Sequence, residues 1–271
     1  DSEHSWNVAF GDKPLFTAIR EGVPQPVTGS IEISRGPFGG VNLYFGTGRY
    51  FAEGDNETSE VQSFYGIWDS PGQGPVAGRG ALIQQLISAG TMSNGYTTRN
   101  ISRNPVSYAT SRGWYVDLVV GTEAAGERFI GAPRLQSGKV IFATYQPGAA
   151  ICSAGGGQNW EYALDILTGG GAMSGVTVTP DGASVCVGDC GAITLNPDGT
   201  GAPVRSIDIF VPQPFRPGTG ATPPGACDPA DPACVDDMIN ASKCTFVLRA
   251  AGAGPQHLPR PCGRQSWRQV R

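Results

Sequence analysis

Residues 40–56 read GVNLYFGTGRYFAEGDN, and VQSFYGIWDS follows at 61–70. The same order returns at 126–148, GERFIGAPRLQSGKVIFATYQPG, and at 159–171, NWEYALDILTGGG. Each copy has an apolar strand pattern, a break of small residues, and a second strand that ends in an aspartate before a Gly-bearing turn. Short strands that recur with turn signals are typical of β-propellers, because one blade cannot cover its own apolar face. The repeat therefore predicts an all-β fold with blade-like units at about 5–70 and 105–170.

Several positions in the two copies suggest chemistry, but a structural role is the better prediction for each. Asp69 and Asp165 hold equivalent places before a turn, where a carboxylate accepts backbone N–H bonds. The run Gly46-Thr47-Gly48 lacks the other glycines of a phosphate-binding loop, so we expect a tight turn there. For residues 54–57, GDNE, we expect a solvated turn rather than an ion site. Tryptophans on strand patterns are expected to pack between blades: Trp68, Trp114, Trp160 and Trp267.

Composition bounds the class of protein. The 271 residues include 40 Gly and 22 Pro without a Gly-X-Y period, which favours a loop-rich all-β domain over collagen or disorder. The net charge is -4, the sequence pI is ≈ 5.2, and basic residues are scattered, so no nucleic-acid interface is predicted. The stretch 79–89, RGALIQQLISA, fits both a helix and two strands and stays open.

Seven cysteines in a chain with only two histidines favour disulfides in an exported protein over a zinc site. Spacing alone does not determine connectivity. The preferred pairs are Cys186 with Cys190, Cys227 with Cys234, and Cys244 with Cys262, which leaves Cys152 unpaired.

The region 172–261 differs from the repeats. VTVT with SVCV, and AITL with RSIDIFV, are expected to form two hairpins or one small inserted sheet. Residues 212–240 are rich in Pro and Gly and predict a long surface loop pinned by Cys227 and Cys234, serving recognition rather than the core. A closing strand is expected at 264–270.

No catalytic, cofactor-binding or metal-binding residue is predicted. The chain lacks a G-x-S-x-G nucleophile motif, and its two histidines lie far apart. The run Asn196-x-Asp198-Gly199 and the acids of 228–237 lack the ligand spacing of a calcium loop. No apolar run reaches the length of a membrane span.

The repeat motifs, together with CSAGG at 152–156 and GRQSWRQVR at 263–271, resemble the C-terminal β-propeller of the PilY family. The resemblance extends from WNVAFGDKPLFTA at 6–18 to the end of the chain and is weakest at 172–261. It implies a partial β-propeller of about three to four blades, with long Pro/Gly-rich loops. It also implies calcium binding, which we expect upstream of Asp1 in a larger precursor.

The family consists of large non-pilin proteins of type IV pilus machines, known as tip-associated adhesins and assembly factors. The resemblance therefore implies a non-enzymatic pilus component that supports pilus biogenesis and adhesion to surfaces or host cells. Minor pilins or the pilus tip complex would be partners, and the protein would pass through the periplasm to the cell surface at the pilus tip. Two alternatives stay open, a quinoprotein-type propeller dehydrogenase and a generic ligand-binding propeller scaffold, because fold alone does not separate them.

Overall fold

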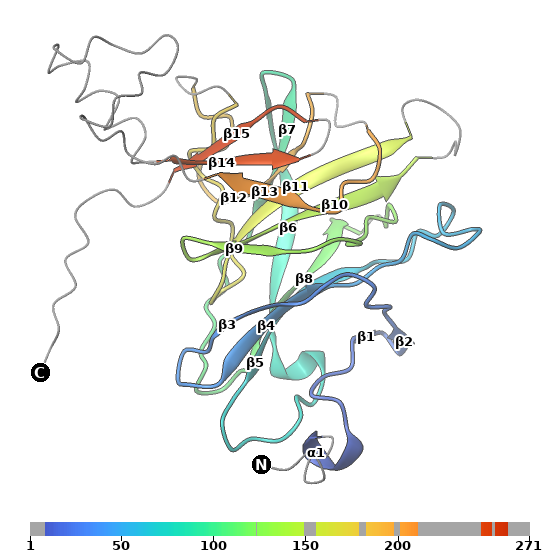
Figure 1. The fold of residues 1–271 in the computed structure, drawn as a ribbon, viewed down its shortest axis with the longest axis vertical. Coiled ribbons are helices and arrows are strands. Elements are labelled where there is room, and N and C mark those ends of the chain that lie inside the picture. Colours follow the sequence, from blue (N-terminus) through green and yellow to red (C-terminus); the bar gives the residue numbers. More distant parts are fainter. Residues whose placement is uncertain are drawn as a thin grey trace, which may run out of the picture.

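The computed structural model of the chain contains two main β-sheets and a small β-hairpin (Figure 1). It describes residues 9–122, 124–148, 156–178, 183–197, 201–210, 245–250 and 253–259. The prediction of an all-β fold is confirmed, because all regular elements of the described residues are strands except the short helix α1 (Ala9–Asp12) and the 3-10 turn η2 (Arg79–Ala81). The expected features at Trp267, Cys152, 212–240 and 264–270 lie outside the described residues.

The large sheet has ten strands, and from either edge the first four strands follow one another in chain order. Strands β3-β4-β5-β8 form a first arm, β9-β10-β11-β12 form a second arm, and the β6–β7 hairpin joins β8 to β12. Within this sheet only the β6–β8 pair is parallel. The bounds are β3 (Glu32–Arg35), β4 (Val41–Gly46), β5 (Ser63–Asp69), β6 (Ile83–Ser93), β7 (Tyr96–Ile101), β8 (Gly113–Val120), β9 (Arg134–Gln136), β10 (Lys139–Pro147), β11 (Gly157–Asp165) and β12 (Cys190–Thr194).

The two arms carry the sequence repeat in matching register. Val41 at the start of β4 pairs with Asp69 at the end of β5, and Lys139 at the start of β10 pairs with Asp165 at the end of β11. The prediction that the two copies occupy equivalent strands, with their aspartates at equivalent turns, is confirmed. β8 comes from the 105–170 stretch, yet it pairs with β5 of the earlier stretch and completes the first arm.

The large sheet curls until its outer strands, β3 and β9, lie near each other, and aromatic rings fill the interior. The Phe64 and Phe142 rings, one from each arm, stack with centroids 3.7 Å apart and an interplanar angle of 1°. Tyr162 continues the stack at 5.0 Å from Phe142. Trp114 is fully buried and Trp68 and Trp160 are nearly so, which confirms the packing role predicted for these tryptophans.

A second sheet covers part of the outer face of the large one. Its order is β13-β14-β15, and its core contacts combine residues of both sheets, such as Ile193, Phe246 and Leu258. The residues AIT of AITL belong to β12 of the large sheet, whereas IDIF pairs with β14. Both the predicted hairpin between these segments and the alternative of one small inserted sheet are therefore wrong. Such pairing joins segments distant in sequence, which turn signals do not encode. The bounds are β13 (Ile207–Phe210), β14 (Thr245–Ala250) and β15 (Gln256–Pro259).

The open choice at 79–89 resolves to a strand. Along β6 the buried Gln85 and Ile87 flank Leu86, which exposes 56% of its surface, so burial alternates with the period of a strand. On the outer face of the first arm, the segment before β1 (Ile19–Arg20) packs its Phe16 against Phe45 and Tyr65. β1 pairs with β2 (Val23–Pro24), and this small hairpin borders the site described next.

Candidate functional site

The connection between β4 and β5 projects from the first arm (Figure 1). We call residues 49–60 the 49–60 loop. Near its tip Phe51 exposes 77% of its surface, although large apolar side chains are usually buried. Two sets of polar contacts hold the loop from its inner side.

The first brace is the carboxylate of Asp55, which is almost fully buried. Its Oδ2 accepts the backbone N–H groups of Phe51 at 3.0 Å and Ala52 at 2.8 Å, while its Oδ1 accepts the Nε of Arg49 at 2.8 Å. The N–H groups of Ala52 and Phe51 hold the pKa of Asp55 below its usual value. The expectation of a solvated turn at 54–57 is therefore wrong for Asp55, because its carboxylate closes the loop instead of facing water.

The second brace is the buried guanidinium of Arg128, which lies in the connection between β8 and β9. Arg128 donates to the backbone carbonyls of Arg49 at 3.1 Å, Asp55 at 2.5 Å and Thr58 at 2.6 Å. It also donates to its near neighbour Gly126 at 2.8 Å. Burial lowers the pKa of Arg128, but a guanidinium stays charged at neutral pH because its ordinary pKa is so high. One side chain thus fixes three points of the 49–60 loop.

The residue before this arginine is anchored in the core. Glu127 accepts an ion-pair bond from Arg99 at 2.5 Å and hydrogen bonds from Thr144 at 2.6 Å and Tyr162 at 2.8 Å. Arg99 also lies over the Trp160 ring at 3.5 Å. A buried ion pair with this many partners has its desolvation compensated and a defined geometry. The network fixes the backbone at Glu127. It thereby also fixes the position from which the Arg128 side chain reaches the loop.

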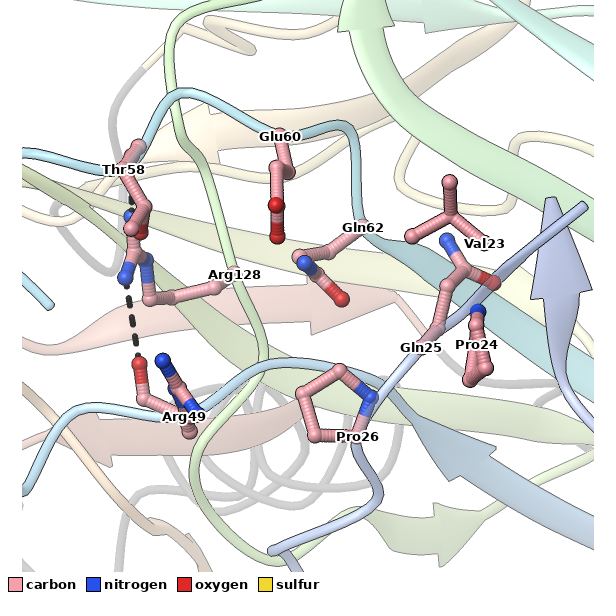
Figure 2. A pocket seen from close by; sticks show the side chains of 9 residues that line it. All are labelled: Val23, Pro24, Gln25, Pro26, Arg49, Thr58, Glu60, Gln62 and Arg128. Atoms are coloured by element: carbon pink, nitrogen blue, oxygen red, sulfur yellow. Dashed lines mark hydrogen bonds between the residues drawn. The ribbon is translucent and has the colours of Figure 1, made fainter. Parts of the chain in front are cut away.

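A groove of about 320 Å³ lies at the base of the loop (Figure 2), and we call it the basal groove. Figure 2 shows the Arg128 guanidinium between Arg49 and Thr58 at one end of the groove, with Val23 and Pro24 at the other. The full lining is Val23, Pro24, Gln25, Pro26, Arg49, Thr58, Glu60, Gln62 and Arg128.

Two glutamines of this groove differ in the hydrogen bonds that their side-chain amides make. Gln25 donates to Val61 O at 3.0 Å and to Ser63 Oγ at 2.9 Å, and it accepts the Tyr65 hydroxyl at 2.5 Å. Gln62 exposes only 7% of its surface, and its Oε1 has no hydrogen-bond partner among the described residues. An unpartnered buried amide oxygen is costly in a folded protein.

A single buried carboxylate, Asp117, supports the wall of the groove. Asp117 accepts Ser63 Oγ and Arg79, each at 2.5 Å, and pairs more loosely with Arg20 at 3.5 Å. Ser63 in turn accepts Gln25, so the groove wall is tied to the first arm by a continuous chain of bonds.

Other predicted site residues are in structural roles. Cys186 and Cys190 form a disulfide, as predicted, and Cys227, Cys234, Cys244 and Cys262 lie outside the described residues. Gly46 ends β4 and Gly48 forms a bridge with Val27, so the predicted tight turn is wrong. Both glycines approach Phe129 closely, and Thr47 Oγ1 accepts Ser63 N at 2.8 Å, so the run has a structural role.

The turn aspartates behave differently from each other. Asp165 accepts Leu167 N at 2.9 Å and Thr168 N at 2.8 Å, as predicted. The Asp69 carboxylate accepts no hydrogen bond from the described residues, so that part of the prediction is wrong. Its second following residue is Pro71, which has no N–H, where the other copy has Leu167.

Sequence reasoning missed Phe51, Arg128 and Gln62. An aromatic residue inside the polar stretch RYFAEGDN was a usable signal for Phe51. Nothing in the sequence pairs Arg128 with the loop carbonyls it binds, because they lie 70 to 79 residues away. Among the described residues no cluster of metal-ligating side chains is found, and no helix there is long and apolar enough to cross a bilayer.

Comparison with known proteins identifies the family to which this chain belongs. A family model described as the PilY1 beta-propeller domain matches residues 2–102. A type IV pilus biogenesis factor PilY1 homolog of Xylella fastidiosa is 39% identical over 98% of the chain. The chain belongs to the PilY family. PilY1 of Pseudomonas aeruginosa PAO1 is 35% identical over 61% of the chain.

The fold agrees with this membership. The crystal structure of the Pseudomonas aeruginosa PilY1 C-terminal domain superposes with a TM-score of 0.62 at 23% identity, over 93% of this chain and 49% of that one. The expected partial β-propeller class is thereby confirmed. The chain spans 18% of the Xylella PilY1 homolog and 16% of the Pseudomonas PilY1.

Proposed function

We propose that this PilY-family chain is the propeller part of a type IV pilus biogenesis factor. The observation that carries the proposal is the 39% identity over 98% of the chain with a protein named for that role. Propeller folds serve many functions, so the family relationship supports the role and the fold alone does not.

In the finer proposal, the protein is a non-enzymatic component at the pilus tip. It is exported through the periplasm, binds minor pilins during assembly and contacts surfaces or host cells. The Cys186–Cys190 disulfide supports export, because disulfides persist mainly in oxidising compartments. The braced loop with its exposed aromatic supports a binding role.

The test is genetic and uses the whole protein. Removing the codons for residues 9–259 from the gene in the source bacterium should abolish or strongly reduce surface pili, counted by electron microscopy, and restoring them should recover piliation. A matched strain carrying Gly74→Ala, a position with open space around it, should assemble pili normally. Normal piliation and normal surface attachment without the propeller would overturn the proposal.

A further inference from the structure

The tip of the 49–60 loop combines an exposed ring with negative charge. Phe51 is 77% exposed, and the basic side chain beside it, Arg49, already pairs with buried Asp55 through Nε. The exposed glutamates of the loop are Glu53, Glu57 and Glu60. The tip therefore presents an aromatic side chain among carboxylates that have no ion-pair partner in the described part of the chain.

The loop is also fixed before any partner arrives. Arg128 and Asp55 bind its backbone from within and leave the tip uncovered. A loop held in one conformation loses little further entropy on binding, so its contacts contribute more fully to affinity. Large aromatic side chains in fixed, central positions are typical energetic hot spots of protein interfaces. A buried guanidinium that binds three carbonyls of one loop is consistent with such preorganisation.

We infer that the 49–60 loop docks onto a minor pilin, with Phe51 entering an apolar pocket whose rim carries Lys or Arg. Charge complementarity selects this partner surface, because exposed glutamates around the ring repel an acidic rim and attract a basic one. The basal groove continues the contact surface, and its Gln62 retains an unpartnered amide oxygen. The identity of the partner as a pilus subunit rests on the proposed function, whereas the chemistry of the contact rests on the loop.

The experiment measures binding of the 271-residue chain to purified minor pilins of the same bacterium by calorimetry. Phe51→Ala should weaken binding at least tenfold. Phe38→Ala is the matched control, since Phe38 is 72% exposed on another turn of the same arm and should bind like the wild type. Both changes remove exposed rings, so unchanged circular dichroism and melting should show that each variant folds.

A second pair of variants tests the rim. Replacing Glu53 and Glu57 together by Lys should weaken binding and remove most of its dependence on ionic strength, because the attraction between the charged rims is lost. The same charge reversal at Glu32, half-exposed on β3, and at Asp208, exposed on β13, should leave binding unchanged.

Each outcome decides the inference. Selective loss with Phe51→Ala and with the loop charge reversal supports it. Wild-type affinity in the loop variants overturns it while leaving the pilus role intact. Failure of the wild-type chain to bind any minor pilin also overturns it, and the piliation experiment above then judges the pilus role separately.

Discussion

Glu161 is a carboxyl group in an apolar layer. It lies on β11, paired across the ladder with Ala143 and Ile193, and 1% of its surface is exposed. Its Oε1 has no partner among the described residues. Burial raises the pKa of Glu161 to about 8, so the folded protein holds this group protonated at neutral pH.

The pH dependence of stability follows from that shift. An unfolded glutamate titrates near a pKa of about 4.3, so below that pH both states are protonated and the shift has no effect. As pH rises toward 8 the unfolded state releases its proton first, and the wild type loses stability on the order of 1.4 kcal/mol per pKa unit. Glu161→Gln should therefore unfold like the wild type near pH 4.5 and be more stable at pH 8.

Urea denaturation at the two pH values measures this difference, with Glu57→Gln as the exposed control. Equal stability differences between Glu161→Gln and wild type at both pH values would show that burial does not govern this group.

Gly66 illustrates a residue selected by close packing. A Cβ at this position would lie 2.5 Å from the Trp114 ring, in the fully buried interior of the curled sheet. Gly66→Ala should cost about 1–3 kcal/mol, because the ring has no space to move into. Gly74→Ala, where no atom lies within 4 Å, should be neutral in the same thermal unfolding experiment. Equal melting of the two variants would contradict the packing argument.

The 49–60 loop depends, as an element, on Arg128. Arg128→Met removes the donors for the carbonyls of Arg49, Asp55 and Thr58, and each hydrogen bond from a charged donor is worth about 1.5–3 kcal/mol. We expect the loop to open locally while the sheets stay folded, since their ladders do not use this side chain.

Glutamyl endopeptidase reports on this opening, because the loop carries three glutamates, Glu53, Glu57 and Glu60. The variant should be cut in the loop much faster than the wild type under native conditions. Arg112→Met, which removes an arginine bonded to Trp68 and Gln73 outside the loop, is the control and should be cut there at the wild-type rate.

In the whole molecule, the two strands on either side of the Pro-rich stretch are neighbours, so we expect that part of the stretch can be deleted without loss of the fold. Phe210 and Val247 are directly paired in the β13–β14 ladder, so the ends of the intervening segment lie side by side. Deleting residues 217–238 still leaves 211–216 and 239–244 to connect the two strands. The melting temperature and far-ultraviolet circular dichroism should therefore stay close to those of the parent, and collapse of the fold would show the segment to be structural.

Much of the large sheet could be predicted from the sequence, because β4, β5, β10 and β11 are buried runs bounded by turn residues. Strand partners were harder to predict. AITL and IDIF are close in sequence but join different sheets, and their destinations depend on segments far along the chain. The candidate site was missed for the same reason, since a guanidinium that binds carbonyls 70 to 79 residues away leaves no local pattern.

The place of β8 between β5 and β6 determines when the sheet can be completed. A nascent chain makes β5, β6 and β7 first, and their partner edges stay open until β8 and then β12 emerge. Pairing between distant segments slows folding, and open strand edges are templates for association with other chains. An incomplete chain that contains only one arm therefore exposes unpaired strand edges during synthesis or export. A chain that ends before Cys190 would leave β7 and β11 without β12, and those edges would recruit foreign strands.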